Sequence, residues 1–228
     1  RKEGFQVILV GLTNSGKSSI LTKLTNASPI ISSSPFTTRE PNIGTMNYDG
    51  VYAQIVDLPP ILGKDFDMSI LHTADYILAV VEKLEDINLF DKILEHCRGK
   101  KLLVINKIDL LSSDALRKLE AQLKSKRSDF VLVSALTGTD VDLLKRKIFE
   151  AMNIIRVYMK EPGKAPSSQP VVLRVGSTVL DVAESIYKGF SKIIVETRLT
   201  GPSGKFANQR VGLNHVLKDR DILEFKTR

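Results

Sequence analysis

The most informative stretch of the chain lies at residues 11–18, which read GLTNSGKS and match the pattern G-x-x-x-x-G-K-[ST]. Glycines let such a loop wrap an anion with its backbone N–H groups pointing inward, and the dipole of a following helix adds positive potential. Lys17 can reach the β- and γ-phosphates of a nucleotide, and Ser18 can hold Mg²⁺. We therefore predict a phosphate site formed by Asn14, Ser15, Gly16, Lys17, Ser18 and Ser19.

A carboxylate, Asp57, follows an apolar run typical of a strand at residues 51–56. A carboxylate at the C-terminal end of a strand, opposite the phosphate loop, suits a water-mediated contact with Mg²⁺. A lone aspartate there is more often a cap or turn residue, and only the upstream phosphate loop favours the metal role. The residues thus predict Ser18 and Asp57 as metal ligands.

The pattern N-K-x-D follows a further expected strand, residues 101–105, and supplies Asn106, Lys107 and Asp109. An aspartate carboxylate can accept hydrogen bonds from the N1–H and the exocyclic amine of guanine, a donor pair that adenine lacks. Asn106 can contact the base and brace the loop, while the stem of Lys107 can cover the ring face. The pattern therefore predicts guanine rather than adenine nucleotides.

Ser134, Ala135 and Leu136 come after the last expected strand of this half, residues 130–133. At that edge of the sheet a backbone N–H can meet the guanine O6. We predict that this run completes the base site, although alone it would indicate nothing.

The elements that must position these residues alternate between strand and helix in the first part of the chain. The strands are runs of Val, Ile and Leu, as in a parallel sheet that is buried on both faces. Such alternation predicts an α/β, doubly wound, three-layer sandwich. The expected strands are residues 5–10, 51–56, 76–81, 101–105 and 130–133, and the expected helices are residues 18–26, 87–97, 115–124 and 141–152.

The second part has a different rhythm, and a loop rich in proline at residues 161–170 lies near its start. Apolar residues alternate at 155–159 and 171–175, and two further strands are expected at 192–198 and 221–225. A helix over residues 178–187, capped by Ser177 or Thr178, is expected before these two strands and after the alternating run at 171–175. This order predicts a small β-grasp module, with domains at residues 1–153 and 154–228.

Charge is distributed unevenly along the 228 residues, whose formal net charge is +7. Residues 154–228 hold 13 Lys and Arg against 7 Asp and Glu, a net +6, while the preceding 153 residues are nearly neutral. The asymmetry indicates that the smaller part meets a polyanion; the alternative is an ordinary solvated basic face.

Composition excludes several classes of protein. The chain is 43% hydrophobic and 26% charged, which excludes disordered and collagen-like proteins. No apolar run approaches the roughly 18 residues of a membrane helix, and we expect no contact with a membrane and no export signal. The one cysteine, Cys97, cannot form an internal disulfide, so we expect a reducing, cytoplasmic location. Because the chain opens without methionine, it also has the look of a fragment.

Together these residues resemble the translation-factor-related GTPases, and the resemblance covers nearly the whole chain. Residues 36–44, FTTREPNIG, are similar to the first switch of the Obg-like group, FTT-x-x-PN-x-G. In that family the second threonine closes onto Mg²⁺ when the γ-phosphate is present, which implies this role for Thr38. The second part looks like a TGS domain, and residues 209–222 resemble the ending of the DRG branch, the developmentally regulated GTP-binding proteins.

The resemblance implies a P-loop GTPase three-layer sandwich with a mostly parallel sheet, followed by a small β-grasp (ubiquitin-like) TGS domain. The chain departs from the DRG pattern in three places. Ten residues precede Gly11 where the family has a helical region, and the path from Asp57 to Asn106 leaves little room for the family's insertion. The family's DxPG reads DLPP here, and Pro60 has no N–H to approach the γ-phosphate.

The residues that could support hydrolysis are few. Ile61 lies where Ras-like enzymes place a glutamine that orients water, and an isoleucine cannot do so. Some relatives hold K⁺ with an asparagine at the position of Asn14, where the ion offsets charge in the transition state; the alternative is that Asn14 only braces the loop. The expected catalytic residues are Lys17, Thr38 and Asn14.

The sequence thus predicts a Mg²⁺-dependent GTPase, slow and stimulated by K⁺, that converts GTP to GDP. By resemblance it would act with the ribosome or another RNA, with the basic TGS part as the docking face, and a protein partner could use the same domain. The alternative is a GTP-binding switch or scaffold with negligible hydrolysis, which Pro60 and Ile61 favour. A weaker alternative is an ATPase, which Asp109 disfavours.

Overall fold

The computed structural model describes residues 4–25 and 41–228. Thr38, expected in the first switch, lies outside the described residues. The chain divides into two compact units, Arg1–Met152 and Asn153–Arg228.

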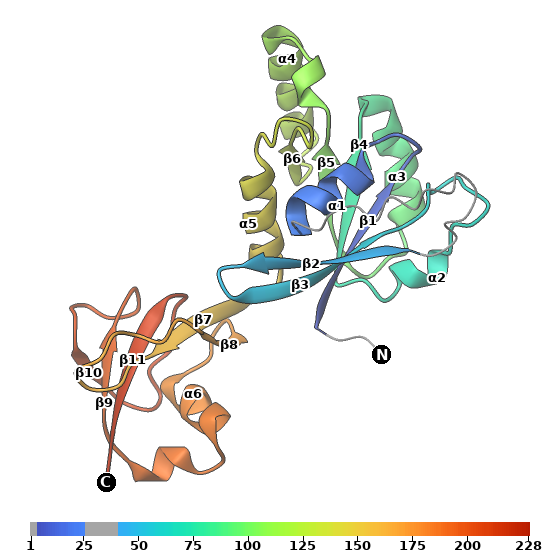
Figure 1. Ribbon diagram of the computed structural model, residues 1–228. Helices are drawn as coiled ribbons and strands as arrows, with labels where there is room; N and C mark the ends of the chain where they lie inside the picture. Colours follow the sequence, from blue (N-terminus) through green and yellow to red (C-terminus); the bar gives the residue numbers. More distant parts are fainter. Residues whose placement is uncertain (1–3, 26–40) are drawn as a thin grey trace. The chain divides into compact units, whose positions relative to one another are not determined.

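The first unit contains a six-stranded sheet with the order β2-β3-β1-β4-β5-β6 (Figure 1). All neighbouring strands are parallel except β2, which runs antiparallel to β3. The strands are β1 (Phe5–Gly11), β2 (Asn42–Tyr48), β3 (Val51–Asp57), β4 (Tyr76–Val81), β5 (Lys100–Ile105) and β6 (Phe130–Leu132). The helices are α1 (Lys17–Thr25), α2 (Met68–Leu71), α3 (Ile87–Leu94), α4 (Ser113–Ser125) and α5 (Val141–Ala151), with 3-10 turns η1 (Leu84–Asp86) and η2 (Ile108–Leu110).

An apolar core lies on each face of the sheet, between the strands and the helices. Both cores follow from the way successive side chains of a strand point to opposite faces. On β4, Tyr76, Leu78 and Val80 point into the core shared with α1 and α5. The intervening side chains of β4 point into the core shared with α2, α3 and α4. Because successive strand residues face opposite sides, an unbroken apolar run fills both cores. The expected three-layer α/β sandwich with a mostly parallel sheet is confirmed.

The sequence did not predict β2, which starts at Asn42 inside the run compared with a first switch. In this edge strand only Met46 is buried, so the segment lacks the apolar pattern of the central strands. Pairing with β3 over seven residues holds it in place. The expected helix at 87–97 ends earlier, at Leu94, and Cys97 lies buried just beyond it.

The second unit is a five-stranded sheet with the order β10-β9-β11-β7-β8, crossed on one face by a single α-helix. Val179 and Val182 of the helix pack against strand residues such as Val157 in one apolar core. This arrangement is the expected β-grasp. Its elements are β7 (Ile154–Met159), β8 (Val171–Arg174), α6 (Val179–Ile186), η3 (Phe190–Ile193), β9 (Ile194–Thr200), β10 (Gln209–Val211) and β11 (Asp221–Thr227).

Thr178, and not Ser177, caps α6. The Thr178 hydroxyl accepts a hydrogen bond from the backbone N–H of Asp181, whose carboxylate accepts one from the Thr178 N–H at 2.7 Å. This reciprocal capping box satisfies two backbone donors that the first turn would otherwise leave free.

The run at residues 209–222 has a structural role in this unit. Buried Asp221 accepts hydrogen bonds from the backbone N–H of Ser203 at 3.1 Å and of Lys218 at 2.7 Å. The ring of His215 pairs with the Ser203 hydroxyl at 2.9 Å. These contacts tie together the two long loops on either side of β10, so His215 stabilises the domain.

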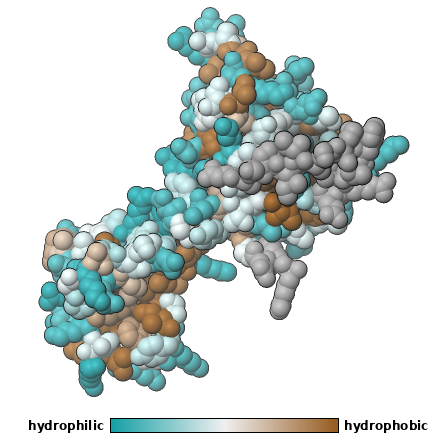
Figure 2. Space-filling view, viewed as in Figure 1, coloured by the Kyte–Doolittle hydropathy of each residue, from teal (hydrophilic) through white to brown (hydrophobic). Residues whose placement is uncertain are grey.

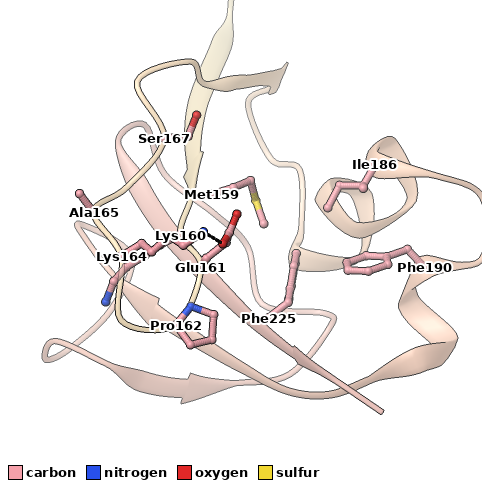
Figure 3. Close-up of a pocket in the computed structure, with 10 residues that line it drawn as sticks. All are labelled: Met159, Lys160, Glu161, Pro162, Lys164, Ala165, Ser167, Ile186, Phe190 and Phe225. Carbon is pink, nitrogen blue, oxygen red and sulfur yellow. Dashed lines mark ion pairs between the residues drawn. The ribbon is translucent and has the colours of Figure 1, made fainter.

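On the helix side of the same sheet, an apolar cavity of about 310 Å³ remains between the strands and the segment after α6 (Figure 3). Met159, Ile186, Phe190 and Phe225 line it, and the rings of Phe190 and Phe225 meet edge to face at 5.6 Å. The segment after β7 lines the rest of the cavity and brings charged side chains to it, among them Glu161 and Lys164.

Hydrophilic residues cover much of the visible surface of both units, and apolar residues form separate patches between them (Figure 2). Within residues 4–25 and 41–228, every helix is too short or too polar to cross a membrane.

Candidate functional site

The loop between β1 and α1 requires glycine at two positions. Gly16 has φ +88°, and a Cβ there would lie 2.1 Å from Nδ2 of Asn106. At Gly11 a Cβ would lie 2.5 Å from the Ser15 hydroxyl and 2.8 Å from the Val80 carbonyl oxygen. Both positions are thus packed too closely for a side chain, so this path of the phosphate loop requires glycine there.

Asn106 connects the three loops of the site. Its Nδ2 donates to the Ser15 carbonyl at 2.9 Å, and its Oδ1 accepts from the Ala135 N–H at 3.0 Å. The side chain is 3% exposed, so water competes little for these bonds. One amide therefore fixes the phosphate loop relative to the loops after β5 and β6.

Lys17 begins α1 and folds back over the loop. Its ammonium donates to the carbonyls of Gly11 and Leu12 at 3.4 and 3.3 Å, both long for hydrogen bonds. Burial lowers the pKa of Lys17, while the negative charge of Asp57 opposes this effect. A buried ammonium with weak partners is stabilised by an incoming anion such as a phosphate.

Ser18 and Asp57 meet at the start of α1 and the end of β3. The Ser18 hydroxyl donates to Asp57 Oδ2 at 2.6 Å. Asp57 is 5% exposed, and its Oδ1 has no hydrogen-bond partner among the described residues. Burial raises the pKa of Asp57, opposed by the Ser18 hydrogen bond, the Lys17 charge and, least, the side chain of Asn42. A buried carboxylate oxygen without a partner, beside a hydroxyl, fits a hard cation such as Mg²⁺.

A cavity of about 530 Å³ opens beside the phosphate loop. Two apolar side chains, Leu110 and Leu136, line this cavity. They are 71% and 80% exposed, so both are available to cover a flat ring. Asp109 lies at the same cavity and accepts a hydrogen bond from the Ser134 hydroxyl. The lining residues are Gly16, Ser19, Thr22, Lys23, Asn106, Lys107, Asp109, Leu110, Ala135 and Leu136.

The structure thus brings the residues expected to bind phosphate and base to one edge of the sheet, Thr38 excepted. It also adds Thr22, Lys23 and Leu110, which sequence reasoning missed. Helical spacing from Ser19 could have found the first two, since positions three and four residues apart share a face. Lys107 has φ +63°, and its ammonium pairs with Glu82 at 2.9 Å.

The backbone of Ile61 contacts the phosphate loop, but its side chain points into the apolar core. Its N–H donates to the Gly11 carbonyl at 3.1 Å, while the side chain is 7% exposed within the apolar core. The preceding Pro60 has no N–H to offer. Neither residue places a side-chain hydrogen-bonding group beside the loop.

Comparison with known proteins finds two family matches. Residues 6–107 match the family described as 50S ribosome-binding GTPase, and residues 155–227 match the TGS domain. A Methanocaldococcus jannaschii protein named uncharacterized GTP-binding protein MJ1326 is 37% identical over 159 residues, which are 67% of this chain and 39% of that protein.

Two further proteins are similar over different extents. The developmentally-regulated GTP-binding protein 2 homolog of Dictyostelium discoideum is 24% identical, covering 96% of this chain and 82% of that protein. Its alignment extends over 303 positions, more than the 228 residues here, so that protein contains segments without a counterpart in this chain. The crystal structure of Era with MgGDPNP and nucleotides 1506–1542 of 16S ribosomal RNA has a TM-score of 0.55 and 25% identity, covering 64% of this chain and 56% of Era.

Two glycines with the same backbone conformation allow a matched test of the loop. Gly16→Ala adds both left-handed strain and the clash with Asn106, whereas Gly138→Ala, at φ +86° with open space around its Cβ position, adds strain alone. We expect Gly138→Ala to cost about 1 kcal/mol of unfolding free energy and Gly16→Ala to cost clearly more. Denaturant unfolding of the ligand-free chain measures both, and equal losses would contradict the packing described for Asn106.

Proposed function

Because the chain belongs to the Obg- and DRG-like GTP-binding proteins that carry a C-terminal TGS domain, we propose that it binds GTP and hydrolyses it to GDP with Mg²⁺. The observation that carries the proposal is the pair of hydrogen bonds made by Asn106. They hold the phosphate loop beside the cavity that Asp109 and Leu136 line, and this neighbourhood supports the binding of one nucleotide by both.

The phosphate end of the site uses charges already present in the fold. The ammonium of Lys17 would leave its long bonds to Gly11 and Leu12 for shorter, charge-assisted bonds to phosphate oxygens. Ser18 and Asp57 would hold Mg²⁺, which supplies positive charge to the phosphates when bound. Thr38 is proposed as a further ligand from the resemblance alone.

The base end of the proposed site would select guanine. Asp109 would accept hydrogen bonds from the N1–H and the amine of the base, and Ser134 holds its carboxylate in place. The N–H of Ala135 is already bonded to Asn106, so the N–H of Leu136 is the one we propose for the guanine O6. The stem of Lys107 and the exposed leucines would cover the ring.

Hydrolysis by the chain alone is proposed to be slow. Ile61 is buried in the core and Pro60 lacks an N–H, so neither orients a water molecule at the γ-phosphate. The same observation favours the second candidate, a GTP-binding switch with negligible hydrolysis. Single-turnover hydrolysis with and without ribosomes separates the two functions.

Asn14 is proposed to assist hydrolysis by holding K⁺. Its φ is +63°, its side chain is exposed, and the amide has no hydrogen-bond partner within the described part of the chain. The alternative, a brace within the loop, would need such a partner. A monovalent cation there would add positive charge beside the phosphates.

We also propose a cytoplasmic role in translation, with the ribosome or another RNA as partner. The family description, the ribosomal RNA in the Era structure and the net +6 of residues 154–228 support this role. A protein partner of the TGS domain is a further proposal.

Replacing Asp109 by Asn tests the base assignment. An amide cannot accept from both guanine donors, so we expect roughly 100-fold weaker GTP binding and a shift of preference toward xanthine nucleotides. Titration with fluorescent nucleotides measures both effects. The control, Asp114→Asn, removes an exposed carboxylate at the start of α4 and should change neither; unaltered GTP affinity in Asp109→Asn would refute the assignment.

Turnover in KCl and NaCl tests the role of Asn14. We expect faster GTP hydrolysis in KCl for the natural chain and for Thr13→Ala, an exposed neighbour in the same loop. Asn14→Ala should hydrolyse GTP equally slowly in both salts. Equal rates for the natural chain would leave Asn14 without this function.

Co-sedimentation tests the proposed partner. With a non-hydrolysable GTP analogue, the chain should sediment with ribosomes at low salt and dissociate steeply as KCl rises, because phosphate contacts release counterions. Failure to sediment at any salt concentration, in material that binds GTP, would exclude the ribosome.

A further inference from the structure

The outward face of the second sheet, opposite α6, carries an excess of positive charge. Since strand residues alternate between faces, the residues that fill the apolar core fix which side chains point outward. Val157, Leu199 and Leu223 point into the core beneath α6, so the residues next to them on each strand point away from α6. The charged members of this outward face are Arg156, Lys160, Arg174, Glu196, Arg198, Arg210, Glu224 and Lys226.

Ion pairs neutralise part of this face. Arg198 pairs with Glu196 at 2.9 Å, and Lys160 pairs with Glu224 at 3.2 Å. Arg156 is buried, and its guanidinium forms an ion pair at 2.7 Å with Asp219, which lies in the loop before β11. Both glutamates of the face are therefore occupied.

Three further cations of the face lie outside these ion pairs. Arg174, Arg210 and Lys226 are exposed, and within residues 41–228 none of them has an ion-pair partner. Arg210 lies directly opposite Arg198 on the neighbouring strand, and Lys226 lies opposite Glu196. The hydrogen bond from Arg198 lowers the pKa of Glu196, and the charges of Arg198, Arg210 and Lys226 lower it further, while burial opposes the shift.

The chemistry of this face suits a phosphate backbone. Arg210 lies on the edge strand β10, Lys226 on the central strand β11 and Arg174 on the other edge strand, β8, so the cations are spread across the width of the sheet. Guanidinium groups donate in a planar fork that matches phosphate oxygens. Tyr158 is the one aromatic residue pointing outward from these strands, too few to stack successive bases.

We propose that the outward face of the TGS sheet, through Arg174, Arg210 and Lys226, binds the phosphate backbone of double-helical RNA. This proposal rests on the proposed role with RNA and deepens it by naming the face and the kind of contact. The helix side, with its apolar cavity and capped α6, takes no part in the contact.

A charge-matched pair of variants tests the proposal in the full chain. Arg210→Gln with Lys226→Gln removes two cations of the outward face, and Lys188→Gln with Lys192→Gln removes two exposed cations that follow α6 on the helix side. The probe is a fluorescent 20-base-pair RNA duplex, titrated from 50 to 300 mM KCl.

We expect the first pair to weaken binding roughly tenfold and to reduce the slope of log affinity against log salt by about two, one unit for each lost phosphate contact. The second pair should bind within twofold of the natural chain. Equal losses in both pairs, or no RNA binding by the natural chain, would overturn the proposal.

Two controls identify the polyanion that this face binds and check that the variants remain folded. A polyglutamate peptide that competes as strongly as RNA would identify an acidic protein as the occupant and overturn the RNA assignment. GTP affinity and thermal unfolding, measured on the same samples, should be unchanged in both pairs. Loss of GTP binding in the natural chain would instead refute the proposed GTPase function, which is a separate outcome.

Discussion

The side chain of Asn106 connects three loops, and the arrangement of the proposed nucleotide site depends on it. It donates to Ser15 in the phosphate loop and accepts from Ala135 in the loop after β6. Both bonds are buried, where an unpaired amide would be costly. The same constraint explains Gly16, since any larger residue would collide with the Asn106 amide.

Around this brace the fold keeps charges where burial disfavours them. Lys17 has a lowered pKa and Asp57 a raised one, and both shifts arise first from burial. Their mutual attraction and the Ser18 hydroxyl offset only part of this cost. A site that keeps a buried ammonium and a buried carboxylate oxygen without strong partners is arranged for an anion and a cation to arrive together.

The two faces of the sheet in the second unit differ, and only one of them is proposed to bind RNA. The helix side contains the core, the apolar cavity and the capped start of α6. The other side has no apolar task, so its alternating positions are free to carry Arg174, Arg210 and Lys226. The long loops beside β10 depend on Asp221, which explains why a polar run such as residues 209–222 contributes to stability.

Sequence alone determined the parts whose physics is local. Buried strands are continuous apolar runs, and the phosphate loop and the N-K-x-D motif are short patterns, so their positions could be read directly. The structure alone showed that Asn106 bonds to Ser15, that Lys107 pairs with Glu82, and that β2 adds to the edge of the sheet. It also decided that Thr178 caps α6 and which face carries the free cations. These features depend on strand register and on contacts between residues far apart in the chain, which packing sets and local pattern does not.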